Sequence, residues 1–367
     1  MEAGKGSADL EQEVLSQGLC TSCGACVNIC PYIKVVRDKV AVIEPCGLTE
    51  GKCYDFCPRT PTDIAALDKS VFGKTRTDYS LGPYIFIEMA QARDSEVRCR
   101  AQYGGVVSAL IKYALDTGEI SNAVLTRPFD GVMMPASVLV AESSQSLECA
   151  GSNYISSATL AKMNEATKQG NDSLGLVGIP CQVLALRKMQ AAKHETGAKG
   201  VKLVIGLFCT WALSYKGFSE FLKGKVDLSQ VRRIDIPPPP ANIMMVETAA
   251  GDIRLSLDEV RKFIKPACGV CYDMTSEFAD ISVGMVEGIG DWNTLIVRTP
   301  AGKRFIDKAK KAGVINTRLL EKTRLEHLRG ASSIKKKRAV DAIQKRTNDK
   351  KNLLYLRLSA QEKKKFL

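Results

Sequence analysis

The sequence predicts an α+β protein in three parts: a small cysteine-rich module near the N-terminus, a central α/β domain and a basic helical tail. Three observations support this division. Seven of the thirteen cysteines lie within the first 57 residues, strand patterns alternate with helix patterns in the middle of the chain, and 21 of the 52 Lys and Arg residues follow residue 300. We place the three parts at residues 10–65, 84–312 and 313–367.

The first part is organised around closely spaced cysteines. Cys20 opens the run C-x2-C-x2-C-x3-C-P, which ends at Cys30 and Pro31. This spacing is typical of bacterial-type ferredoxin loops that hold a [4Fe-4S] cluster, and in such loops the fourth cysteine serves a second cluster. Zinc is the alternative for CxxC pairs, but zinc sites seldom use four cysteines in one eleven-residue run. The spacing therefore predicts a ferredoxin-like module with two clusters.

The segment that would hold the second cluster is incomplete. It reads C-x6-C-x3-C-P and ends at Pro58, one cysteine short of an intact motif. We assign the first cluster to Cys20, Cys23, Cys26 and Cys57. The second cluster then has Cys30, Cys46 and Cys53. Three thiolates suffice for a [3Fe-4S] cluster, whereas Asp55 or Cys99 could complete a [4Fe-4S] cluster.

The elements around these cysteines are short. A helix is predicted over residues 10–17, after a disordered start at residues 1–10. Alternating apolar residues predict a hairpin of two strands at 34–36 and 39–43. Residues 65–84 have the composition of a connector without a core of its own.

The central part alternates strands with helices, which predicts an α/β core. Strands are predicted at 84–89, 122–125, 136–141, 174–177 and 201–207, and helices at 106–116, 157–169, 181–193 and 304–311. A hairpin is predicted around Gly251, and strands at 279–283 and 294–297 flank a glycine-rich bend that begins at Gly284. The prolines at 237–240 predict a stiff loop.

Four further cysteines are candidates for a third cluster. Cys268 and Cys271 form a CxxC pair, which supplies half of a cluster's ligands. Cys181 lies at a strand-to-helix turn and Cys209 follows a strand, and strand ends are where cofactors gather in α/β sheets. We therefore join the four into a [4Fe-4S] site. The alternative is that Cys181 and Cys209 are ordinary buried cysteines.

A glycine pair marks a candidate site for a phosphate-containing cofactor. Gly104 and Gly105 precede a predicted helix, where backbone N–H groups and the positive helix end could meet a phosphate or pyrophosphate. The sequence has neither the dinucleotide-binding G-x-G-x-x-G after a strand nor the G-x-x-x-x-G-K-[ST] of NTPases. The pair alone is weak support, because many such pairs form tight turns.

Five motifs in this order resemble the coenzyme F420 hydrogenase/dehydrogenase beta subunit family. They are Gly104-Gly105-Val-Val-Ser108-Ala-Leu110, Gly151-Ser152-Asn153-Tyr154, Val177-Gly178-Ile179-Pro180-Cys181-Gln182, Cys268-Gly-Val-Cys271-Tyr-Asp273 and Ala279-Asp280-Ile281-Ser282-Val283-Gly284. The resemblance covers about residues 84–312. The fused N-terminal module is similar to the arrangement in F420H2 dehydrogenase input subunits and formate dehydrogenase beta subunits. Met274 departs from the pattern, which more often has Phe after the aspartate.

The resemblance implies an α/β core that holds FAD and one [4Fe-4S] cluster, with coenzyme F420 docking against the flavin. It implies that the ligands of this cluster are Cys181, Cys209, Cys268 and Cys271. It also implies flavin contacts from the motif residues, for which we take Gly104, Gly105, Ser108, Ser152, Asn153, Tyr154, Pro180, Gln182, Asp280 and Gly284. No side chain is expected to act as a nucleophile.

The expected function is that of an iron-sulfur flavoprotein subunit with two or three clusters. Hydride would pass between a soluble carrier, F420, and FAD, and electrons would pass between FAD and the clusters. The partner would be a catalytic or electron-accepting subunit of a dehydrogenase, hydrogenase or reductase complex. The alternatives are an NAD(P)H-linked subunit and a stand-alone ferredoxin-dependent reductase of an organic substrate.

The net charge of +12 is a property of the tail, because only 6 of the 40 Asp and Glu residues follow residue 300. The block Lys335–Arg338 is expected to be exposed. The tail could dock on a partner or on a membrane surface, or be a solvated helical face. It lacks the interleaved aromatic residues of a nucleic-acid-binding segment. No apolar run reaches about 18 residues and no signal peptide is visible, so we expect a cytoplasmic protein.

Overall fold

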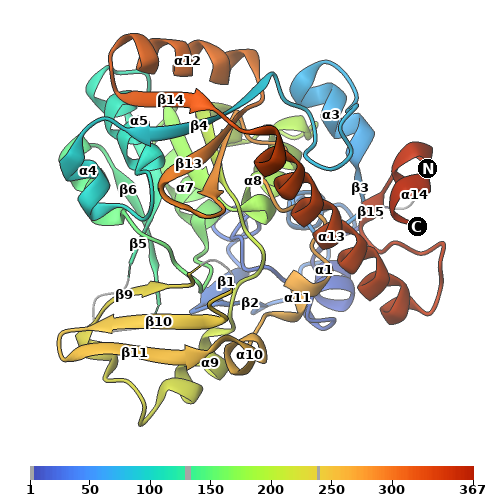
Figure 1. Ribbon diagram of the computed structural model, residues 1–367. Coiled ribbons are helices and arrows are strands. Elements are labelled where there is room, and N and C mark those ends of the chain that lie inside the picture. The colour runs from blue at the N-terminus through green and yellow to red at the C-terminus, as the bar shows by residue number, and fades with distance from the viewer. Residues whose placement is uncertain (1–3, 129–133, 238–239) are drawn as a thin grey trace.

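The computed structural model describes residues 4–128, 134–237 and 240–367. An eight-stranded sheet forms its centre (Figure 1). In spatial order the strands are β14 (Ile315–Leu319), β4 (Phe86–Ala92), β13 (Ile289–Val297), β12 (Ile281–Val286), β8 (Val201–Leu207), β7 (Leu174–Gly178), β5 (Asn122–Arg127) and β6 (Ala136–Val140). The four strands from β12 to β5 are parallel, and the outer pairs are antiparallel. The predicted α/β core is therefore confirmed.

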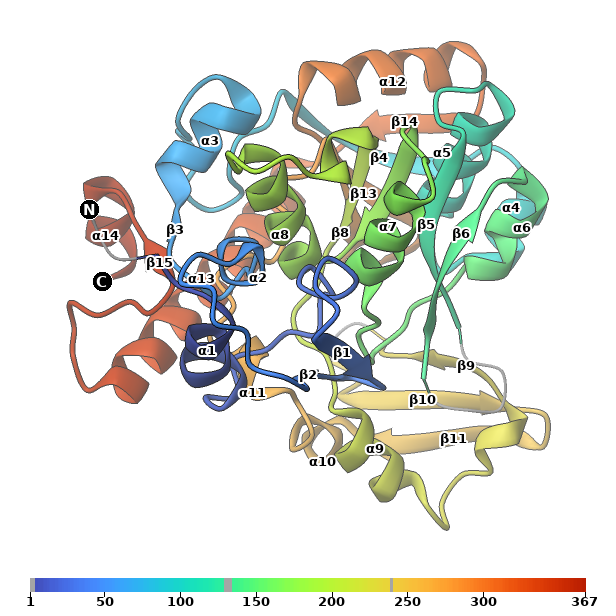
Figure 2. The ribbon, with the colours of Figure 1, turned by 180° about the vertical axis from the view of Figure 1, so that it is seen from behind.

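Helices cover both faces of this sheet. The helices are α5 (Val106–Asp116) and α12 (Pro300–Lys311) on one face, and α7 (Thr159–Lys168) and α8 (Pro180–Ala191) on the other. Neighbouring residues of a strand point to opposite faces. Val124 accordingly packs in the same core as α7 and α8, whereas Ala123 and Leu125 pack with α5 and α12. Figure 2 shows α7 and α8 in front of the sheet.

A small antiparallel sheet lies beyond one end of the large one. Its strands are β9 (Val231–Asp235), β10 (Ile243–Thr248) and β11 (Gly251–Ser256), packed against α9 (Tyr215–Leu222) and α10 (Leu257–Arg261). The predicted hairpin around Gly251 is confirmed, since Thr248 pairs with Gly251. Of the predicted proline loop, residues 238–239 lie outside the described residues.

The predicted glycine-rich bend is confirmed at Gly288 but is wrong at Gly284. Gly284 lies inside β12 and pairs with Thr294 of β13, and the turn comes at Gly288, which has a positive φ of 77°. Gly284 is needed for packing instead. A Cβ there would lie 1.9 Å from the ring of Phe208.

The N-terminal module packs on the face that carries α7 and α8. It contains α1 (Ser7–Leu10), a π-helical turn (Glu11–Leu15), the hairpin β1 (Ile33–Val36) and β2 (Lys39–Val42), and α2 (Lys52–Asp55). The predicted hairpin is confirmed, but residues 7–10 are helical rather than disordered, and residues 1–3 lie outside the described chain. Gly24, with φ +85°, lies so close to α7 that a Cβ would be 2.6 Å from the Ala161 nitrogen.

The segment expected to be a plain connector contains a buried helix. This helix, α3 (Ile64–Phe72), begins at Asp63, whose side chain accepts the Ala66 N–H, and ends at Gly73 with a left-handed φ of 70°. Its residues Ile64 and Leu67 belong to the same core as the N-terminal module. The prediction of a connector without a core is therefore wrong.

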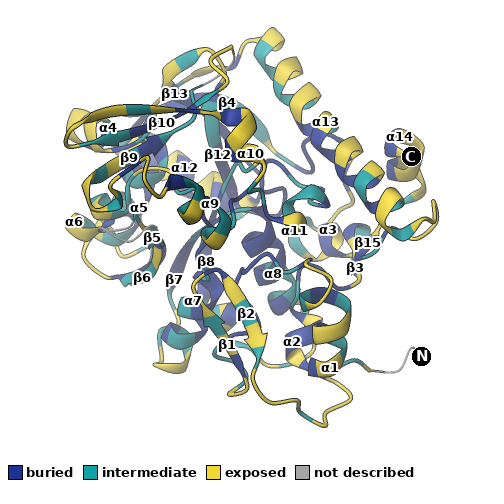
Figure 3. Cartoon of the chain, turned by 90° about the horizontal axis from the view of Figure 1, so that it is seen from below, coloured by how far each residue is buried: buried dark blue, intermediate teal, exposed yellow. Residues whose placement is uncertain are grey.

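The C-terminal residues fold back onto the body of the protein. They form the 26-residue helix α13 (Lys322–Thr347), a short strand β15 (Leu356–Arg357) that pairs with β3 (Thr62–Asp63), and α14 (Ala360–Phe366). Figure 3 shows buried residues along one side of α13. Among the described residues, no helix is both long and apolar enough to cross a membrane.

The expected exposure of the Lys335–Arg338 block is wrong for its first two residues. Lys335 is 3% exposed and Lys336 is fully buried, whereas Lys337 and Arg338 are exposed. The reason is helical periodicity, because Lys336 lies on the same side of the helix as the buried Val340 and so faces the core.

Candidate functional site

The structure gathers the four cysteines predicted for the first cluster. They lie on the loop before β1 and, for Cys57, just after α2. Burial raises the pKa of the Cys23 thiol to about 12, with contributions from the charges of Cys57 and Cys20. Burial, followed by Cys23, Cys57 and Cys20, likewise raises the pKa of Cys26. The thiols therefore lie close enough to act on one another.

Backbone amides point at these sulfur atoms. The Ser22 N–H donates to Cys20 Sγ at 3.4 Å, and the Arg59 N–H donates to Cys57 Sγ at 3.4 Å. Such bonds stabilise thiolate and tune the potential of a bound cluster. None of the thirteen cysteines is in a disulfide. The donor set fits an iron-sulfur cluster, while the assignment of its individual ligands stays a prediction.

The three cysteines predicted for the second cluster also lie together. Burial raises the pKa of Cys53 to about 11, and the charges of Cys30 and Cys46 add to this rise. A hydroxyl that the sequence did not reveal lies beside them. Ser7 Oγ is 3.1 Å from Cys46 Sγ, and this hydrogen bond is the main cause of the lowered pKa of Cys46. Ser7 and Cys46 are 39 positions apart in the chain, so no spacing signal could have predicted this contact.

The two suggested fourth ligands are not favoured by the geometry. The Asp55 carboxylate faces His194, with Oδ2 3.3 Å from Nε2. Cys99 is exposed on α4 (Ser95–Arg100), which Figures 1 and 2 show on the opposite side of the molecule from α1 and α2. By contrast, the Ser7 hydroxyl lies within hydrogen-bond distance of a thiol of this group.

The four cysteines predicted for the third cluster converge from three different segments. Cys181 is in the first turn of α8, Cys209 follows β8, and Cys268 and Cys271 lie in and after α11 (Pro266–Gly269). Burial raises the pKa of Cys209, to which the charges of Cys268, Cys181 and Cys271 contribute. We call these four cysteines the core thiol group. The alternative of two unrelated buried cysteines is not what the geometry favours.

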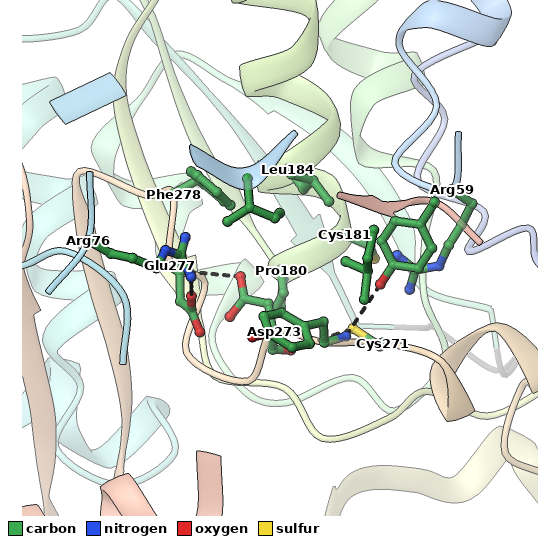
Figure 4. A pocket seen from close by; sticks show the side chains of 13 residues that line it. Arg59, Arg76, Pro180, Cys181, Leu184, Cys271, Asp273, Glu277 and Phe278 are labelled. Atoms are coloured by element: carbon green, nitrogen blue, oxygen red, sulfur yellow. Dashed lines mark hydrogen bonds and ion pairs between the residues drawn. The ribbon is translucent and has the colours of Figure 1, made fainter. Parts of the chain in front are cut away.

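Two buried cations lie beside the core thiol group, and no sequence motif indicates either of them. Lys335 Nζ donates to the carbonyl oxygens of Cys209 and Asp273, at 2.6 and 2.7 Å. Arg59 donates to the Ala267 carbonyl at 3.2 Å and lies over the ring of Tyr355 (Figure 4). Burial opposes ionisation of the Cys271 thiol, but the charges of Lys335 and Arg59 outweigh it and lower the pKa.

Each of the three thiol groups lies near the next one in space. The charge of Cys53 acts on Cys26, which links the second group to the first. After burial, the charge of Cys23 contributes most to the raised pKa of Cys181, which links the first group to the core thiol group. Lys188 of α8 also donates to the Cys57 carbonyl at 2.7 Å. The groups therefore form a series from the N-terminal module into the α/β domain.

None of the groups is compact enough for a single ion. Within the described chain, no three His, Cys, Asp or Glu side chains converge closely enough to hold one metal ion. In a four-iron cluster each cysteine binds its own iron, so its ligands stand farther apart than those of one zinc ion.

A small cavity lies beside the core thiol group (Figure 4). Its volume of about 20 Å³ holds about one water molecule. Cys181 and Cys271 line one end, and Arg76 and Glu277 line the other. Arg76 is paired with Glu277 at 2.6 Å, and Lys336 pairs with the same carboxylate at 2.5 Å. This cavity is too small for a flavin.

The residues predicted to bind flavin fall into two sets. Gly104, Gly105 and Ser108 lie at the start of α5, where Gly104 leaves no room for a Cβ against Asn293, 2.7 Å away. Ser152, Asn153 and Tyr154 approach the same region. The Tyr154 hydroxyl accepts the Ile236 N–H, and Gln102, which precedes the glycine pair, donates to the neighbouring Asp235 of β9.

This region contains buried polar atoms that lack hydrogen-bond partners among the described residues. They are Gln102 Oε1, Asn153 Oδ1 and Arg233 Nε. An unpaired buried polar atom is costly, so a polar ligand between these side chains would be favourable. The α5 N-terminus and these atoms fit a flavin nucleotide.

The second set serves the protein itself. Gln182 accepts the Ile179 N–H and donates to the Ser157 carbonyl, both at 2.9 Å, and it follows Pro180 in the first turn of α8. Asp280 accepts from the Val204 N–H at 2.9 Å and from the Thr299 hydroxyl at 2.8 Å. Their hydrogen bonds brace the sheet, and Phe208 covers Gly284. These contacts give the motif residues a structural role, and their contact with a flavin stays a prediction.

The protein combines an α/β sheet with a ferredoxin-type segment, and this combination is that of an iron-sulfur electron-transfer subunit. Comparison with known proteins agrees with this class. Residues 13–32 match the 4Fe-4S binding domain. Residues 88–164 and 171–323 match the N-terminal and C-terminal parts of the coenzyme F420 hydrogenase/dehydrogenase beta subunit. Together with the relative described next, these matches show that the chain belongs to the coenzyme F420 hydrogenase/dehydrogenase beta subunit family, which confirms the resemblance.

Individual proteins support this. The chain is 32% identical to the coenzyme F420 hydrogenase subunit beta of Methanothermobacter thermautotrophicus, over 71% of this chain and 94% of that one. It is 30% identical to the coenzyme F420-dependent sulfite reductase of Methanocaldococcus jannaschii over 85% of its own length, but it spans only 49% of that protein. A chain of the F420-reducing [NiFe] hydrogenase complex from Methanosarcina barkeri has a TM-score of 0.68 and 29% identity, covering 73% of this chain and 94% of that chain.

Proposed function

We propose that this subunit carries electrons between coenzyme F420 and a partner redox protein, through FAD and three iron-sulfur clusters. The observation that carries the proposal is the series of three thiol groups. The charge of Cys53 acts on Cys26, the charge of Cys23 acts on Cys181, and Lys188 of α8 donates to the Cys57 carbonyl at 2.7 Å. The names of the relatives, which include a coenzyme F420 hydrogenase subunit, support the choice of F420.

The chain's own residues would bind and position these groups. FAD, when bound, accepts a hydride and passes electrons on singly. The start of α5 presents backbone N–H groups to a phosphate, and Asn153 and Gln102 offer buried oxygen atoms that need donors. The amides at Ser22 and Arg59 hold the thiolates of the first group. No side chain needs to form a covalent bond with substrate.

The second thiol group is the end of the series that a partner protein could approach. Two of its three thiols, Cys30 and Cys46, are partly buried, as are two of the four in the first group, Cys20 and Cys57. Tyr32, Ile43 and Leu48, from the same part of the chain, are exposed. We assign the contact with an electron-accepting or electron-donating subunit to this side of the N-terminal module.

Anaerobic purification followed by metal and flavin analysis tests the proposal. We expect about twelve irons for three four-iron clusters, or about eleven if the second has three irons. Reduced F420, NADH and NADPH are then added in separate experiments. We expect the flavin absorbance to bleach with reduced F420 and to stay unchanged with NADH and NADPH. Recovery of zinc without flavin would refute the proposal. Bleaching by NADH or NADPH alone would replace F420 with a nicotinamide.

A further inference from the structure

Arg59 and Lys335 stand out because they lie outside every segment that matches a known family. The matches cover residues 13–32, 88–164 and 171–323. Both side chains are nonetheless buried against the core thiol group, at 5% and 3% exposure. They come from opposite ends of the chain, Arg59 from the N-terminal module and Lys335 from α13.

Neither cation forms an ion pair with a carboxylate among the residues that the structure describes. Lys336, the next residue, has its charge balanced by Glu277 at 2.5 Å. Lys335 bonds only to carbonyl oxygens in the described chain, and Arg59 likewise donates to the carbonyls of Pro58 and Ala267. Arg59 Nε has no partner among the described residues. A buried charge is unfavourable unless an opposite charge lies nearby.

The core thiol group is a source of negative charge beside both cations. Lys335 bonds the carbonyl of Cys209 itself, and it shares the Asp273 carbonyl with the Cys271 thiol, whose Sγ is 3.5 Å from that oxygen. Arg59 bonds the carbonyl of the residue that precedes Cys268. The cations thus flank the group from two sides, and each is fixed by backbone contacts.

We propose that Arg59 and Lys335 are the counter-cations of the centre held by Cys181, Cys209, Cys268 and Cys271, and that they raise its reduction potential. A cluster gains one negative charge on reduction, and fixed positive charges in a low dielectric favour the more negative state. This inference rests on the proposed function, because it requires a cluster at the core thiol group. It makes the C-terminal helix part of the redox site.

The test is an EPR-monitored redox titration of the holoprotein and three variants of α13. Lys335→Met removes the charge but keeps most of the side-chain volume, Lys335→Arg keeps the charge, and Lys337→Met removes an exposed charge from the same helix. For Lys335→Met we expect the reduced-to-oxidised ratio of one centre to fall about tenfold at fixed potential, a shift of about −59 mV for one electron. Lys335→Arg and Lys337→Met should stay near the wild-type value.

Arg59→Gln provides an independent arm from the other end of the chain, should Lys335→Met fail to fold. It is expected to shift the same centre in the same direction. Unchanged midpoint potentials in both Lys335→Met and Arg59→Gln, at wild-type iron content, would overturn the inference. Its failure is separable from that of the proposed function. If the wild-type protein lacks iron at the core thiol group, the proposed function fails, whereas a full cluster with unmoved potentials refutes only the role of the cations.

Discussion

The core thiol group and the second N-terminal group differ in what surrounds them. The core thiol group has two fixed cations beside it, Arg59 and Lys335, the second of which comes from α13. The second group has a neutral hydroxyl, that of Ser7, beside Cys46. The contrast supports the proposal that fixed charges tune a centre in the core, and it leads us to propose that the Ser7 hydrogen bond tunes a centre in the second group.

The largest effect is expected from removing a thiol of the core group. Cys271→Ser should cost about four irons per chain and abolish the reduction of the N-terminal clusters by reduced F420, because one of the four ligand positions is lost. Cys149→Ser is the matched control, since Cys149 is partly buried but belongs to none of the three groups. Iron analysis and stopped-flow reduction give the readout. Wild-type iron and rate in Cys271→Ser would remove the core centre from the scheme.

The next effect concerns the ion pairs behind the core thiol group. Glu277→Gln should lower the free energy of unfolding by about 3–5 kcal/mol, because it removes the ion pair of the buried Lys336. Arg76 keeps its ion pair with Asp68 at 2.7 Å. Anaerobic urea unfolding measures this. Glu259→Gln, at an exposed position of α10, should change stability by less than about 0.5 kcal/mol.

The sign of the pH dependence follows from the pKa of Glu277. Burial opposes its ionisation, but Lys336 and Arg76 outweigh burial and lower the pKa. Its contribution to stability is therefore fully present above the ordinary glutamate range and is lost as pH falls below it. The difference between wild type and Glu277→Gln should shrink in acid. A constant difference down to low pH would contradict the assigned role of the charge.

A smaller effect tests whether α13 is part of the core. Ile343→Ala should destabilise the protein by about 2–4 kcal/mol, because Ile343 is fully buried between α13 and the N-terminal module. Ile334→Ala on the same helix, where the side chain is 68% exposed, should cost less than about 0.5 kcal/mol. Equal urea midpoints for the two variants would indicate that the helix detaches in solution.

The division of the cysteines into groups could be predicted because it depends on local rules. The spacing from Cys20 to Cys30 determines a loop, and the ends of parallel strands bring Cys181 and Cys209 to the same edge of the sheet. Such rules say nothing about residues that arrive from elsewhere in the chain. Ser7, Arg59 and Lys335 reach the thiols only through tertiary packing.

The predictions that failed share a physical cause. A run of four charged residues reads as exposed, yet a helix presents each of them in a different direction, so Lys335 and Lys336 face the core while Lys337 faces water. Gly284 reads as a bend, but its missing Cβ makes room for Phe208 within a strand. Composition describes a segment as a whole, whereas burial is decided residue by residue.

The smallest effect separates two roles for Ser7 in the second group. Because Ser7 Oγ lies within hydrogen-bond distance of Cys46 Sγ, at 3.1 Å, we expect it to donate to this thiolate rather than to bind an iron of its own. Loss of that bond in Ser7→Ala should lower the potential of one centre slightly, with no change in iron content, while Ser16→Ala at an exposed position leaves it unchanged. The same titration used for α13 measures this. A loss of iron from Ser7→Ala would instead make Ser7 a ligand, and the second centre would then differ from the core centre in ligand chemistry as well as in surrounding charge.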